Sequence, residues 1–379
     1  MLDVGRPDLT LGVVGTGTMG RGIAQIAAAS GVRVLLLDAR PGAAEEARNA
    51  VADTFEMLAG KGRMTPEAAR DATARLAAVD AEADLAGCHV VVEAIVEDLK
   101  AKQDLFARLE PIVGDGCLLA TNTSSLSVTS IASACRRPDR VGGFHFFNPV
   151  PLMKVVEVIA GVMTEPWVAE ALTALARRMG HHPVRAADTP GFIVNHAGRG
   201  FGTEALRILQ EGVASFDEVD HVLRETAGFR MGPFELLDLT GLDVSHPVME
   251  SIYDQFYQEP RFRPSYVLRQ RLAAGLLGRK TGQGFYAYDG GKPRPVAAPA
   301  IAAGERRPVW IDAAEAEWRR ALARLVEAAG WPLDDAATPA RESLCIVAPL
   351  GWDATATALA RELDAERTVA VDMLFGLDR

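Results

Sequence analysis

The chain has 379 residues, of which 49% are hydrophobic and 24% are charged. This composition is that of a globular protein of about two to three domains, and it excludes disorder, collagen-like structure and coiled coil for the chain as a whole. A formal charge of −10 argues against nucleic acid or an anionic membrane surface as the main partner.

The cysteines and the N-terminus indicate a cytoplasmic protein. The four cysteines are far apart and form no C-x-x-C pair, so we expect reduced thiols and no metal site: Cys88, Cys117, Cys135 and Cys345. Residues 1–10 contain no apolar core, which argues against a signal peptide. No apolar run reaches the roughly 18 residues of a membrane span.

The first half of the chain alternates strand and helix patterns. A buried strand at 11–15, a helix at 19–30 closed by Gly31, and a buried strand at 32–38 make a βαβ unit. The later elements are a helix at 98–110 and strands at 89–94, 117–121, 141–147 and 153–159. The fold class is therefore α/β, with a Rossmann-type doubly wound sheet over residues 1–188.

Three further regions follow the sheet. Residues 189–290 repeat apolar side chains at helical spacing, with helix starts near Asp217 and Pro233, and predict an all-α domain. Residues 291–308 are rich in Gly, Pro and Ala and read as a linker. Residues 309–379 return to an α/β pattern and form a small tail without a glycine-rich loop.

The first strand and helix of the chain flank a dinucleotide-binding fingerprint. The stretch Gly15-Thr16-Gly17-Thr18-Met19-Gly20 is G-x-G-x-x-G. Gly15 permits the tight turn, Gly17 lets the backbone approach a pyrophosphate, and Gly20 lets the helix pack on the strand. The pyrophosphate would lie at the helix N-terminus. FAD would use the same loop, and a glycine turn without a ligand is the remaining alternative.

Asp38 ends the second strand, 21 residues after Gly17. Its carboxylate can accept hydrogen bonds from a ribose 2′-hydroxyl and would repel a 2′-phosphate, which predicts NAD rather than NADP. Arg40, two residues later, weakens this prediction because it could face a phosphate.

His145 and Glu157 are the candidate catalytic pair. If the strands that contain them form a hairpin around Pro151, the midpoint of the two positions, the side chains are cross-strand neighbours on one face. A carboxylate would fix the imidazole tautomer and stabilise the imidazolium, as a general base requires. The alternative is a structural His–Glu hydrogen bond.

Two polar residues are weaker candidates. Ser124 follows the strand at 117–121, at the edge of the sheet where ligands bind, and could hold a substrate oxygen or cap a helix. Asn195 lies at the start of the helical region and could face a cleft or act as a cap.

Several motifs together resemble the short-chain L-3-hydroxyacyl-CoA dehydrogenases over residues 9–289. They are GVVGTGTMGRGIAQIAA, VVEAIVEDLKAKQDLF, ATNTSSLSVTSIA, GFHFFNPVPLMKVVEVI, DTPGFIVN, MGPFELLDLTGLD and GLLGRKTGQGFY.

The resemblance implies an NAD-binding Rossmann domain followed by a helical domain that forms a dimer. It implies catalytic roles for His145, Glu157, Ser124 and Asn195. The implied NAD contacts are Gly15, Gly17, Thr18, Met19, Gly20, Asp38, Glu97, Lys102, Asn122 and Lys280. The implied contacts to the acyl-CoA substrate are Lys61, Arg63, Ser124 and Asn148, although the two basic residues could equally be solvated charges at a helix end.

The chain departs from the family pattern at two places. His196 stands where the family often has Arg after GFIVN. The tail resembles the spacer of long bacterial members, including 3-hydroxyadipyl-CoA dehydrogenases of phenylacetate breakdown, which continue into a second helical domain. We therefore expect a fragment of a longer protein.

The function predicted is NAD-dependent oxidation of an L-3-hydroxyacyl-CoA to the 3-oxoacyl-CoA. The alternatives are a dehydrogenase of a free hydroxy acid or sugar acid, and a non-catalytic NAD-binding protein on the same fold. The acyl chain cannot be deduced from the sequence. A dicarboxylic substrate would need a cation, and Arg199, Arg207 and Arg230 are equal candidates.

Overall fold

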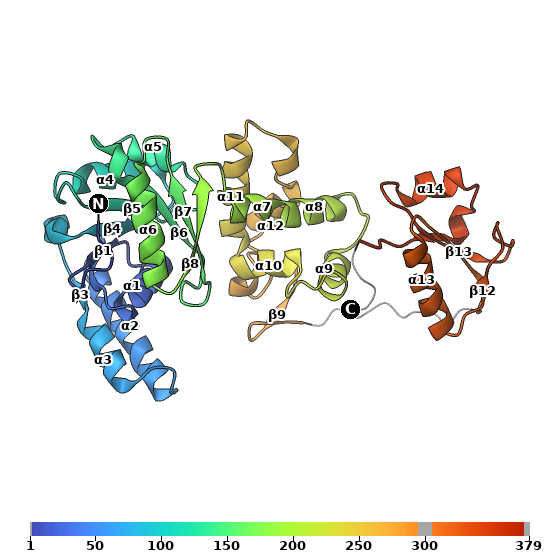
Figure 1. Ribbon diagram of the computed structural model, residues 1–379, viewed down its shortest axis with the longest axis horizontal. Helices are drawn as coiled ribbons and strands as arrows, with labels where there is room; N and C mark the ends of the chain where they lie inside the picture. The colour runs from blue at the N-terminus through green and yellow to red at the C-terminus, as the bar shows by residue number, and fades with distance from the viewer. Residues whose placement is uncertain (1, 295–304, 375–379) are drawn as a thin grey trace. The chain divides into compact units, whose positions relative to one another are not determined.

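The computed structural model describes residues 2–294 and 305–374, which divide into two compact units (Figure 1). The first unit contains residues up to Thr203 together with His246–Pro264. The second contains Glu204–Ser245 and the chain from Ser265 onward. Residues 246–264, inside the predicted helical region, therefore group with the sheet. Among the described residues, no helix is both long and apolar enough to span a membrane.

The first unit is built on an eight-stranded sheet. Its order is β3-β2-β1-β4-β5-β6-β7-β8, and the strands β3 to β6 are parallel. β7 runs antiparallel to β6, and β8 runs parallel to β7. The strands are β1 Thr10–Val14, β2 Arg33–Leu37, β3 Leu76–Ala78, β4 Val90–Glu93, β5 Leu118–Thr121, β6 Val141–Phe146, β7 Val155–Ala160 and β8 His182–Ala187. The strand order reverses between β1 and β4, the position where ligands bind in such sheets.

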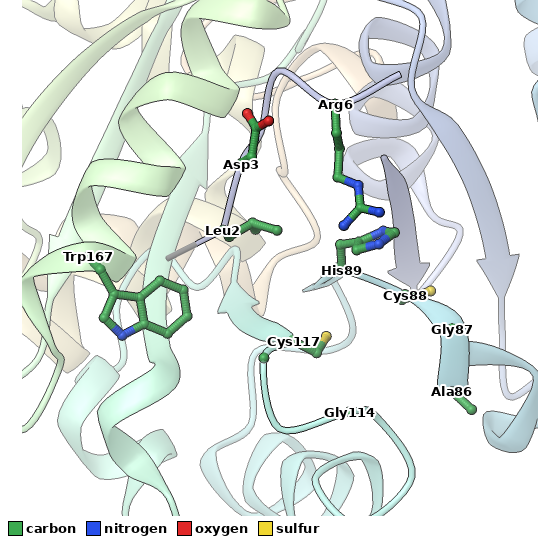
Figure 2. Close-up of a pocket in the computed structure, with 11 residues that line it drawn as sticks. Leu2, Asp3, Arg6, Ala86, Gly87, Cys88, His89, Gly114, Cys117 and Trp167 are labelled. Carbon is green, nitrogen blue, oxygen red and sulfur yellow. The ribbon is translucent and has the colours of Figure 1, made fainter. Parts of the chain in front are cut away.

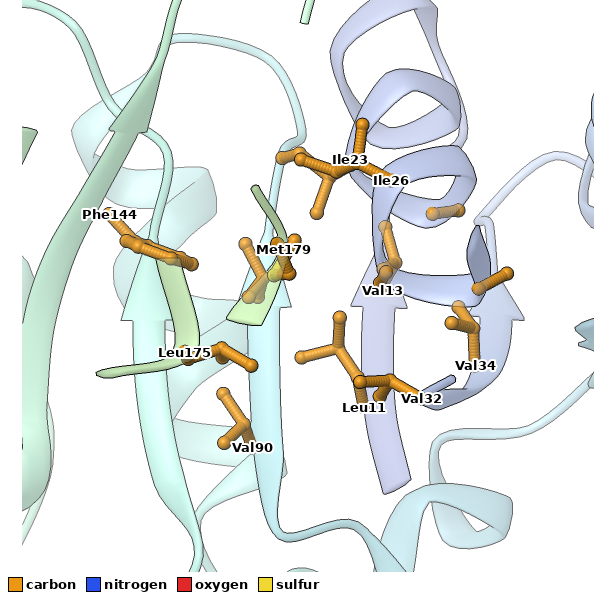
Figure 3. Packing of buried hydrophobic residues seen from close by; sticks show 14 of the residues in the cluster. Leu11, Val13, Ile23, Ile26, Val32, Val34, Val90, Phe144, Leu175 and Met179 are labelled. Carbon is orange, nitrogen blue, oxygen red and sulfur yellow. The ribbon is translucent and has the colours of Figure 1, made fainter. Parts of the chain in front are cut away.

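Helices cover both faces of this sheet, so its strands are apolar on both sides. Residues of α1, α2, α3 and α6 pack with one face, and residues of α4 and α5 pack with the other. Figure 3 shows Leu11 and Val13 of β1 against Ile23 of α1 in the first of these cores. The helices are α1 Thr18–Ala29, α2 Ala43–Gly60, α3 Pro66–Ala74, α4 Leu99–Leu109, α5 Val128–Ala132, α6 Pro166–Arg178 and α7 Val194–Ala197, with short 3-10 turns η1 Glu82–Gly87, η2 Pro138–Arg140 and η3 Pro260–Phe262.

The predicted elements of the first unit are confirmed to within two residues, and several further elements were not predicted. Gly31 has a φ of +83°, as a glycine that ends a helix requires. The helices α2, α3, α5 and α6 and the short strand β3 have no counterpart among the predictions. α2 and α3 form a hairpin that connects β2 to β3 along the chain.

Two buried carboxylates organise the helical part of the second unit. Asp220 accepts hydrogen bonds from the main-chain N–H of Phe234 and from the Tyr286 hydroxyl, and Asp238 accepts from the main-chain N–H groups of Phe285 and Tyr286. The elements are α9 Phe216–Glu225, α10 Pro233–Thr240, α12 Tyr266–Ala273, the turn η4 Arg279–Thr281 and the hairpin β9 Tyr288–Asp289 and β10 Lys292–Pro293; α8 Arg199–Gln210 and α11 Leu242–Gln255 each have residues in both units.

The tail is a small α/β unit, as predicted. Its four parallel strands have the order β12-β11-β13-β14. The tail also has an apolar cluster of its own. The elements are β11 Val309–Ala313, α13 Ala316–Ala328, β12 Leu333–Asp334, β13 Leu344–Ala348, α14 Ala354–Ala360, η5 Ala365–Arg367 and β14 Thr368–Ala370. The predicted linker at 291–308 begins with the strand β10, and its residues 295–304 lie outside the described residues.

A hollow of about 530 Å³ lies at the amino ends of β4 and β5 (Figure 2). Arg6, His89 and Trp167 line it, and Arg6 is bonded through two nitrogens to Asp8. Ligands of open parallel sheets bind at the opposite edge, at the carboxyl ends of the strands. This hollow is therefore separate from the candidate site described next.

Candidate active site

The glycine loop after β1 has the geometry that the fingerprint requires. Gly15 has a φ of +93°, and a Cβ added there would lie 2.5 Å from the carbonyl oxygen of Ala94. A Cβ at Gly20 would lie 1.8 Å from the carbonyl oxygen of Gly15, whereas one at Gly17 would meet no atom within 4 Å. α1 begins at Thr18 without a side-chain cap. The loop thus offers open space and main-chain N–H groups to an anion.

Asp38 is fixed beside this loop. Its Oδ2 accepts the main-chain N–H and the hydroxyl of Thr16, both at 2.7 Å, and its Oδ1 accepts the N–H of Arg40 at 3.0 Å. Burial opposes ionisation, but the N–H groups of Arg40 and Thr16 outweigh it, and the pKa of Asp38 is lowered. The Arg40 guanidinium pairs with Glu46, so the cation that weakened the NAD prediction already has a carboxylate partner.

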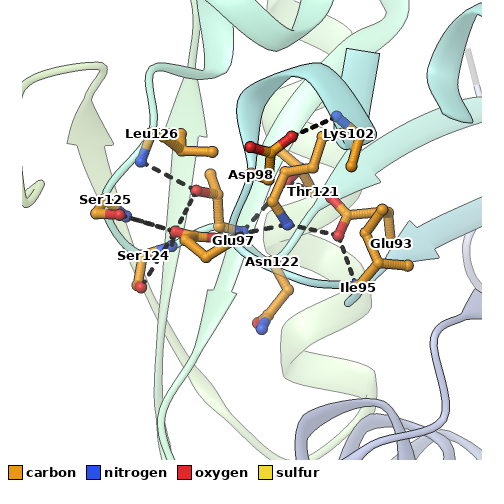
Figure 4. A network of polar contacts seen from close by, with 12 residues as sticks. Glu93, Ile95, Glu97, Asp98, Lys102, Thr121, Asn122, Ser124, Ser125 and Leu126 are labelled. Carbon is orange, nitrogen blue, oxygen red and sulfur yellow. Dashed lines mark hydrogen bonds and ion pairs between the residues drawn. The ribbon is translucent and has the colours of Figure 1, made fainter. Parts of the chain in front are cut away.

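A buried ion-pair network connects the ends of β4 and β5 (Figure 4). Glu93, which is fully buried, accepts the Lys102 ammonium at 2.6 Å and the Thr121 hydroxyl at 2.7 Å. Lys102 is 1% exposed and also lies 3.3 Å from Glu97. The ammonium of Lys102 therefore holds two carboxylates together at the carboxyl edge of the sheet.

Glu97 fixes the loop after β5. Its Oε1 accepts the Thr123 hydroxyl at 2.7 Å and the main-chain N–H groups of Ser124 and Ser125 at 2.8 and 2.9 Å (Figure 4). Burial opposes ionisation, but Lys102 and these donors outweigh it, so the pKa of Glu97 is lowered. The Ser124 hydroxyl lies 3.3 Å from the same oxygen, so the carboxylate defines where Ser124 stands.

His145 and Glu157 are directly opposite each other in the β6–β7 ladder, which confirms the predicted register. His145 Nδ1 lies 2.6 Å from Glu157 Oε2, and the two residues are 4% and 0% exposed. With the proton on Nδ1 donated to the carboxylate, the Nε2 atom carries the lone pair that a general base needs.

The second oxygen of Glu157 is bound by the start of the helical region. Its Oε1 accepts the main-chain N–H groups of Ile193 and Val194 at 2.8 and 2.9 Å. Burial raises the pKa of Glu157, but the hydrogen bond with His145 and the two N–H groups lower it by a larger amount. The net shift of the pKa is therefore downward. The carboxylate is thus kept ionised beside the imidazole.

The same turn brings Asn195 to the loop after β5. Phe192 at the turn has a φ of +50°, and its ring centroid lies 5.7 Å from that of His145. Asn195 donates through Nδ2 to the Ser124 carbonyl oxygen at 3.3 Å. The predicted residues Ser124, His145, Glu157 and Asn195 therefore belong to one connected arrangement within the first unit.

The remaining predicted residues lie in more exposed places. Lys61 and Arg63 are exposed in the turn between α2 and α3, and Asn148 is exposed just after β6. Asn122 has its Oδ1 bound by the N–H of Phe146 at 2.9 Å. Lys280 belongs to the second unit, where its ammonium pairs with Asp243.

The sequence analysis did not predict the residues that support the candidate site through hydrogen bonds and ion pairs. Glu93 and Thr121 anchor the network, and Asp188 accepts the main-chain N–H groups of Val128 and Thr129 at the start of α5. A signal existed for Glu93, because an acid that ends an otherwise apolar strand is rarely left without a buried partner. Among the described residues, no group of His, Cys, Asp and Glu is suited to a metal ion.

The comparison with known families fits this geometry. Residues 10–189 match the NAD-binding domain of 3-hydroxyacyl-CoA dehydrogenase, and residues 191–288 match the C-terminal domain of the same family. The chain belongs to the 3-hydroxyacyl-CoA dehydrogenase family. It is therefore a member of an oxidoreductase family, and its cofactor is NAD.

Two named relatives are identical to this chain at 40% or more of the aligned positions. The 3-hydroxyadipyl-CoA dehydrogenase of Escherichia coli is 44% identical over 277 residues, which are 73% of this chain and 58% of that protein. The mitochondrial hydroxyacyl-coenzyme A dehydrogenase of Homo sapiens is 40% identical over 282 residues, or 73% of this chain and 90% of that protein. The chain thus spans little more than half the length of the bacterial relative.

Solved structures extend the similarity. The (S)-3-hydroxybutyryl-CoA dehydrogenase of Ralstonia eutropha has a TM-score of 0.71 at 38% identity and covers 74% of this chain and 99% of its own. A 3-hydroxybutyryl-CoA dehydrogenase of Escherichia coli has a TM-score of 0.82 at 36% identity and covers 96% of this chain and 72% of its own. The tail therefore has a counterpart in at least one family member.

Proposed function

We propose that this protein oxidises an L-3-hydroxyacyl-CoA to the 3-oxoacyl-CoA with NAD, and that His145 is the general base. The observation that carries this proposal is the buried contact of 2.6 Å between His145 and Glu157. Both oxygens of Glu157 are already bound, one by the imidazole and one by two main-chain N–H groups. The imidazole is therefore held in one orientation before the substrate arrives.

The proposed roles of the residues follow from their partners. Bound NAD supplies the hydride acceptor for C3 of the substrate. His145 takes the hydroxyl proton on Nε2, and the ionised Glu157 stabilises the imidazolium that forms. Ser124 and Asn195, which are joined by a hydrogen bond, hold the substrate oxygens.

The cofactor would be bound from several elements. Gly15, Gly17, Thr18, Met19 and Gly20 would approach the pyrophosphate, and Asp38 would accept a ribose hydroxyl. We propose that Glu97 and Asn122 line the nicotinamide side. Lys102 would act through Glu97, because its ammonium is buried between two carboxylates. Lys280 remains a proposed cofactor contact.

The substrate is proposed to be a coenzyme A ester. The exposed Lys61 and Arg63 at the α2–α3 turn would face its phosphates. Relatives are named for both 3-hydroxyadipyl-CoA and 3-hydroxybutyryl-CoA, so both acyl groups are candidates for the substrate of this protein.

Replacement of the histidine tests the proposal. His145→Gln should lower kcat by roughly 10²–10⁴, the usual contribution of a positioned general base, while the Kd for NADH stays near that of the wild type. The assay is acetoacetyl-CoA reduction with NADH, and the Kd follows from NADH fluorescence. His221→Gln, at an exposed position on α9, is the matched control.

Three outcomes would contradict the proposal in different ways. Wild-type turnover by His145→Gln removes the histidine from the mechanism. Turnover of free 3-hydroxybutyrate but not of its CoA ester indicates the free-acid alternative. NADH binding without turnover of any 3-oxoacyl-CoA or free hydroxy acid indicates a non-catalytic protein.

A further inference from the structure

Arg199, the first residue of α8, has an unusual environment. Its Nε donates to the main-chain carbonyl of Asn195 at 3.0 Å. Its Nη1 is buried and has no hydrogen-bond partner within the described chain. Burial lowers the pKa of Arg199, and no carboxylate of residues 2–294 or 305–374 lies within ion-pair distance of it. A half-buried cation with a buried, unpaired nitrogen is costly unless something pairs with it.

The other arginines of the described chain with a buried unpartnered nitrogen differ from Arg199 in one respect. Arg48 pairs with Glu45, and Arg140 lies 3.9 Å from Glu110 and also donates to two carbonyl groups. Their charge is compensated within the protein. Arg207, two turns further along α8, is 52% exposed and pairs with Glu204. Of the candidate cations on α8, only Arg199 has no acidic partner in the described residues.

Arg199 is connected to the proposed active site. Asn195, whose carbonyl it binds, donates to the Ser124 carbonyl. Asn195 and Arg199 are four positions apart, about one helical turn, or roughly 5–6 Å. The far carboxyl group of a six-carbon dicarboxylic chain lies three bonds beyond C3, a distance of the same order. A chain whose C3 oxygen lies at Asn195 can therefore place its far end near the guanidinium.

We propose that Arg199 binds a carboxylate of the substrate, and that this is the far carboxylate of a dicarboxylic 3-hydroxyacyl-CoA. A guanidinium presents two parallel N–H groups that match the two oxygens of a carboxylate, and the pair neutralises the buried charge. The inference rests on the proposed function. A free hydroxy acid could supply a carboxylate of the same chemistry, and the test below separates the two sources.

The test compares two substrates of equal chain length. We expect the wild type to prefer 3-hydroxyadipyl-CoA to 3-hydroxyhexanoyl-CoA by about 10- to 100-fold in kcat/KM, the usual effect of a hydrogen-bonded charge pair. Arg199→Met should reduce this ratio to near one, and Arg199→Lys should restore part of it. Arg207→Met, the control on the same helix, should keep the wild-type ratio.

The ratio distinguishes binding of the carboxylate from a structural role. If Arg199 only supports Asn195, Arg199→Met slows both substrates equally and the ratio is unchanged, which overturns the inference. A wild type without preference for the dicarboxylic ester overturns it even if Arg199→Met fails to fold. Preferred turnover of free 3-hydroxyadipate assigns the carboxylate to a free acid and overturns the assignment to a CoA ester. If the wild type turns over no 3-hydroxyacyl-CoA at all, the proposed function itself is refuted.

Discussion

Glu157 shows how a single buried residue orders the site. A carboxylate removed from water is costly unless donors replace its hydration. The imidazole of His145 and the N–H groups of Ile193 and Val194 do so within 3 Å. The same three bonds join β6, β7 and the start of α7. Orientation of the base and attachment of the segment that contains Asn195 are therefore one property of the fold.

This arrangement predicts a pH-dependent effect of Glu157→Gln. The pKa of Glu157 is depressed below its ordinary value of 4.5, so its ionisation favours the native state above that pH, and the contribution is lost as the pH falls. We expect Glu157→Gln to lower the free energy of unfolding by about 1–3 kcal/mol at pH 7. In urea titrations the difference from the wild type should be constant above about pH 4.5 and shrink as the pH falls below that value. A difference that is constant or grows on acidification below that value would contradict this explanation.

Asp38 allows a prediction about cofactor choice. Asp38→Ala removes the acceptor for the ribose hydroxyl and the charge that repels a 2′-phosphate. KM for NAD should rise roughly 10- to 100-fold, and the preference for NAD over NADP should narrow. Steady-state kinetics with both cofactors measure the two effects. If the preference is unchanged, the adenosine ribose is recognised by other residues.

At the same scale, the sequence predicted the contact between His145 and Glu157 but not the residues that support the site. His145 and Glu157 lie symmetrically about Pro151, and a hairpin has only one register that makes them neighbours. The Thr121 hydroxyl on β5 donates to Glu93 at the end of β4, and the main-chain N–H groups of Ser124 and Ser125 donate to Glu97. No local spacing encodes such a network, because it depends on the order of β4 and β5 in the sheet.

The loop and helix that follow β1 provide a matched pair of substitutions. A Cβ at Gly20 would overlap the carbonyl oxygen of Gly15, whereas a Cβ at Gly17, where φ is −65°, has free space. Gly20→Ala should therefore lower the free energy of unfolding by about 1–3 kcal/mol or more. Gly17→Ala should leave Tm near that of the wild type but weaken NADH binding by about tenfold, since the methyl group would occupy the approach to the pyrophosphate.

Calorimetry and NADH titration of the two variants decide this prediction. Equal destabilisation by both substitutions would mean that the loop is packed at Gly17 as well. Unchanged NADH affinity in Gly17→Ala would mean that the pyrophosphate does not approach the loop at that residue.

The helix α11 lies in the region predicted to be helical, but its own bounds were not predicted. α11 contains Pro247 in its interior, and proline normally argues against a helix there because it removes a main-chain bond. Tertiary packing outweighs this local cost: Leu242, Met249 and Ile252 of α11 are buried. The strands β1, β2, β4 and β5 were readily predicted, since helices cover both faces and the strands become short apolar runs.

The second unit exposes apolar side chains on two neighbouring helices. Val222 of α9 and Leu236 and Leu239 of α10 are exposed, and the two helices contact each other. Because exposed apolar groups on adjacent helices often mark an interface, we expect the protein to form a dimer through this region. Light scattering after size exclusion should give twice the mass of one chain, and Leu239→Asp should shift it toward the monomer. A wild-type monomer at micromolar concentration would contradict this expectation.

The tail differs from the rest of the chain in its relation to the relatives. The (S)-3-hydroxybutyryl-CoA dehydrogenase structure described above aligns over nearly its whole length with 74% of this chain, which leaves the tail without a counterpart there. The tail also has its own sheet and its own apolar cluster, made of Val309, Ile311, Leu322, Val326 and Ala348. All residues of the proposed chemistry precede residue 294.

A chain shortened after Arg294 should therefore remain an active dehydrogenase. We expect its kcat/KM with acetoacetyl-CoA and NADH to stay within tenfold of the full chain, a difference of less than about 1.4 kcal/mol in transition-state stabilisation. Its melting curve should lose only the contribution of the tail. A larger loss of activity, with circular dichroism showing the sheet intact, would mean that the tail helps to hold the proposed catalytic residues. Within the described residues, the hydrogen bonds of His145, Glu157, Ser124 and Asn195 reach no residue of the tail.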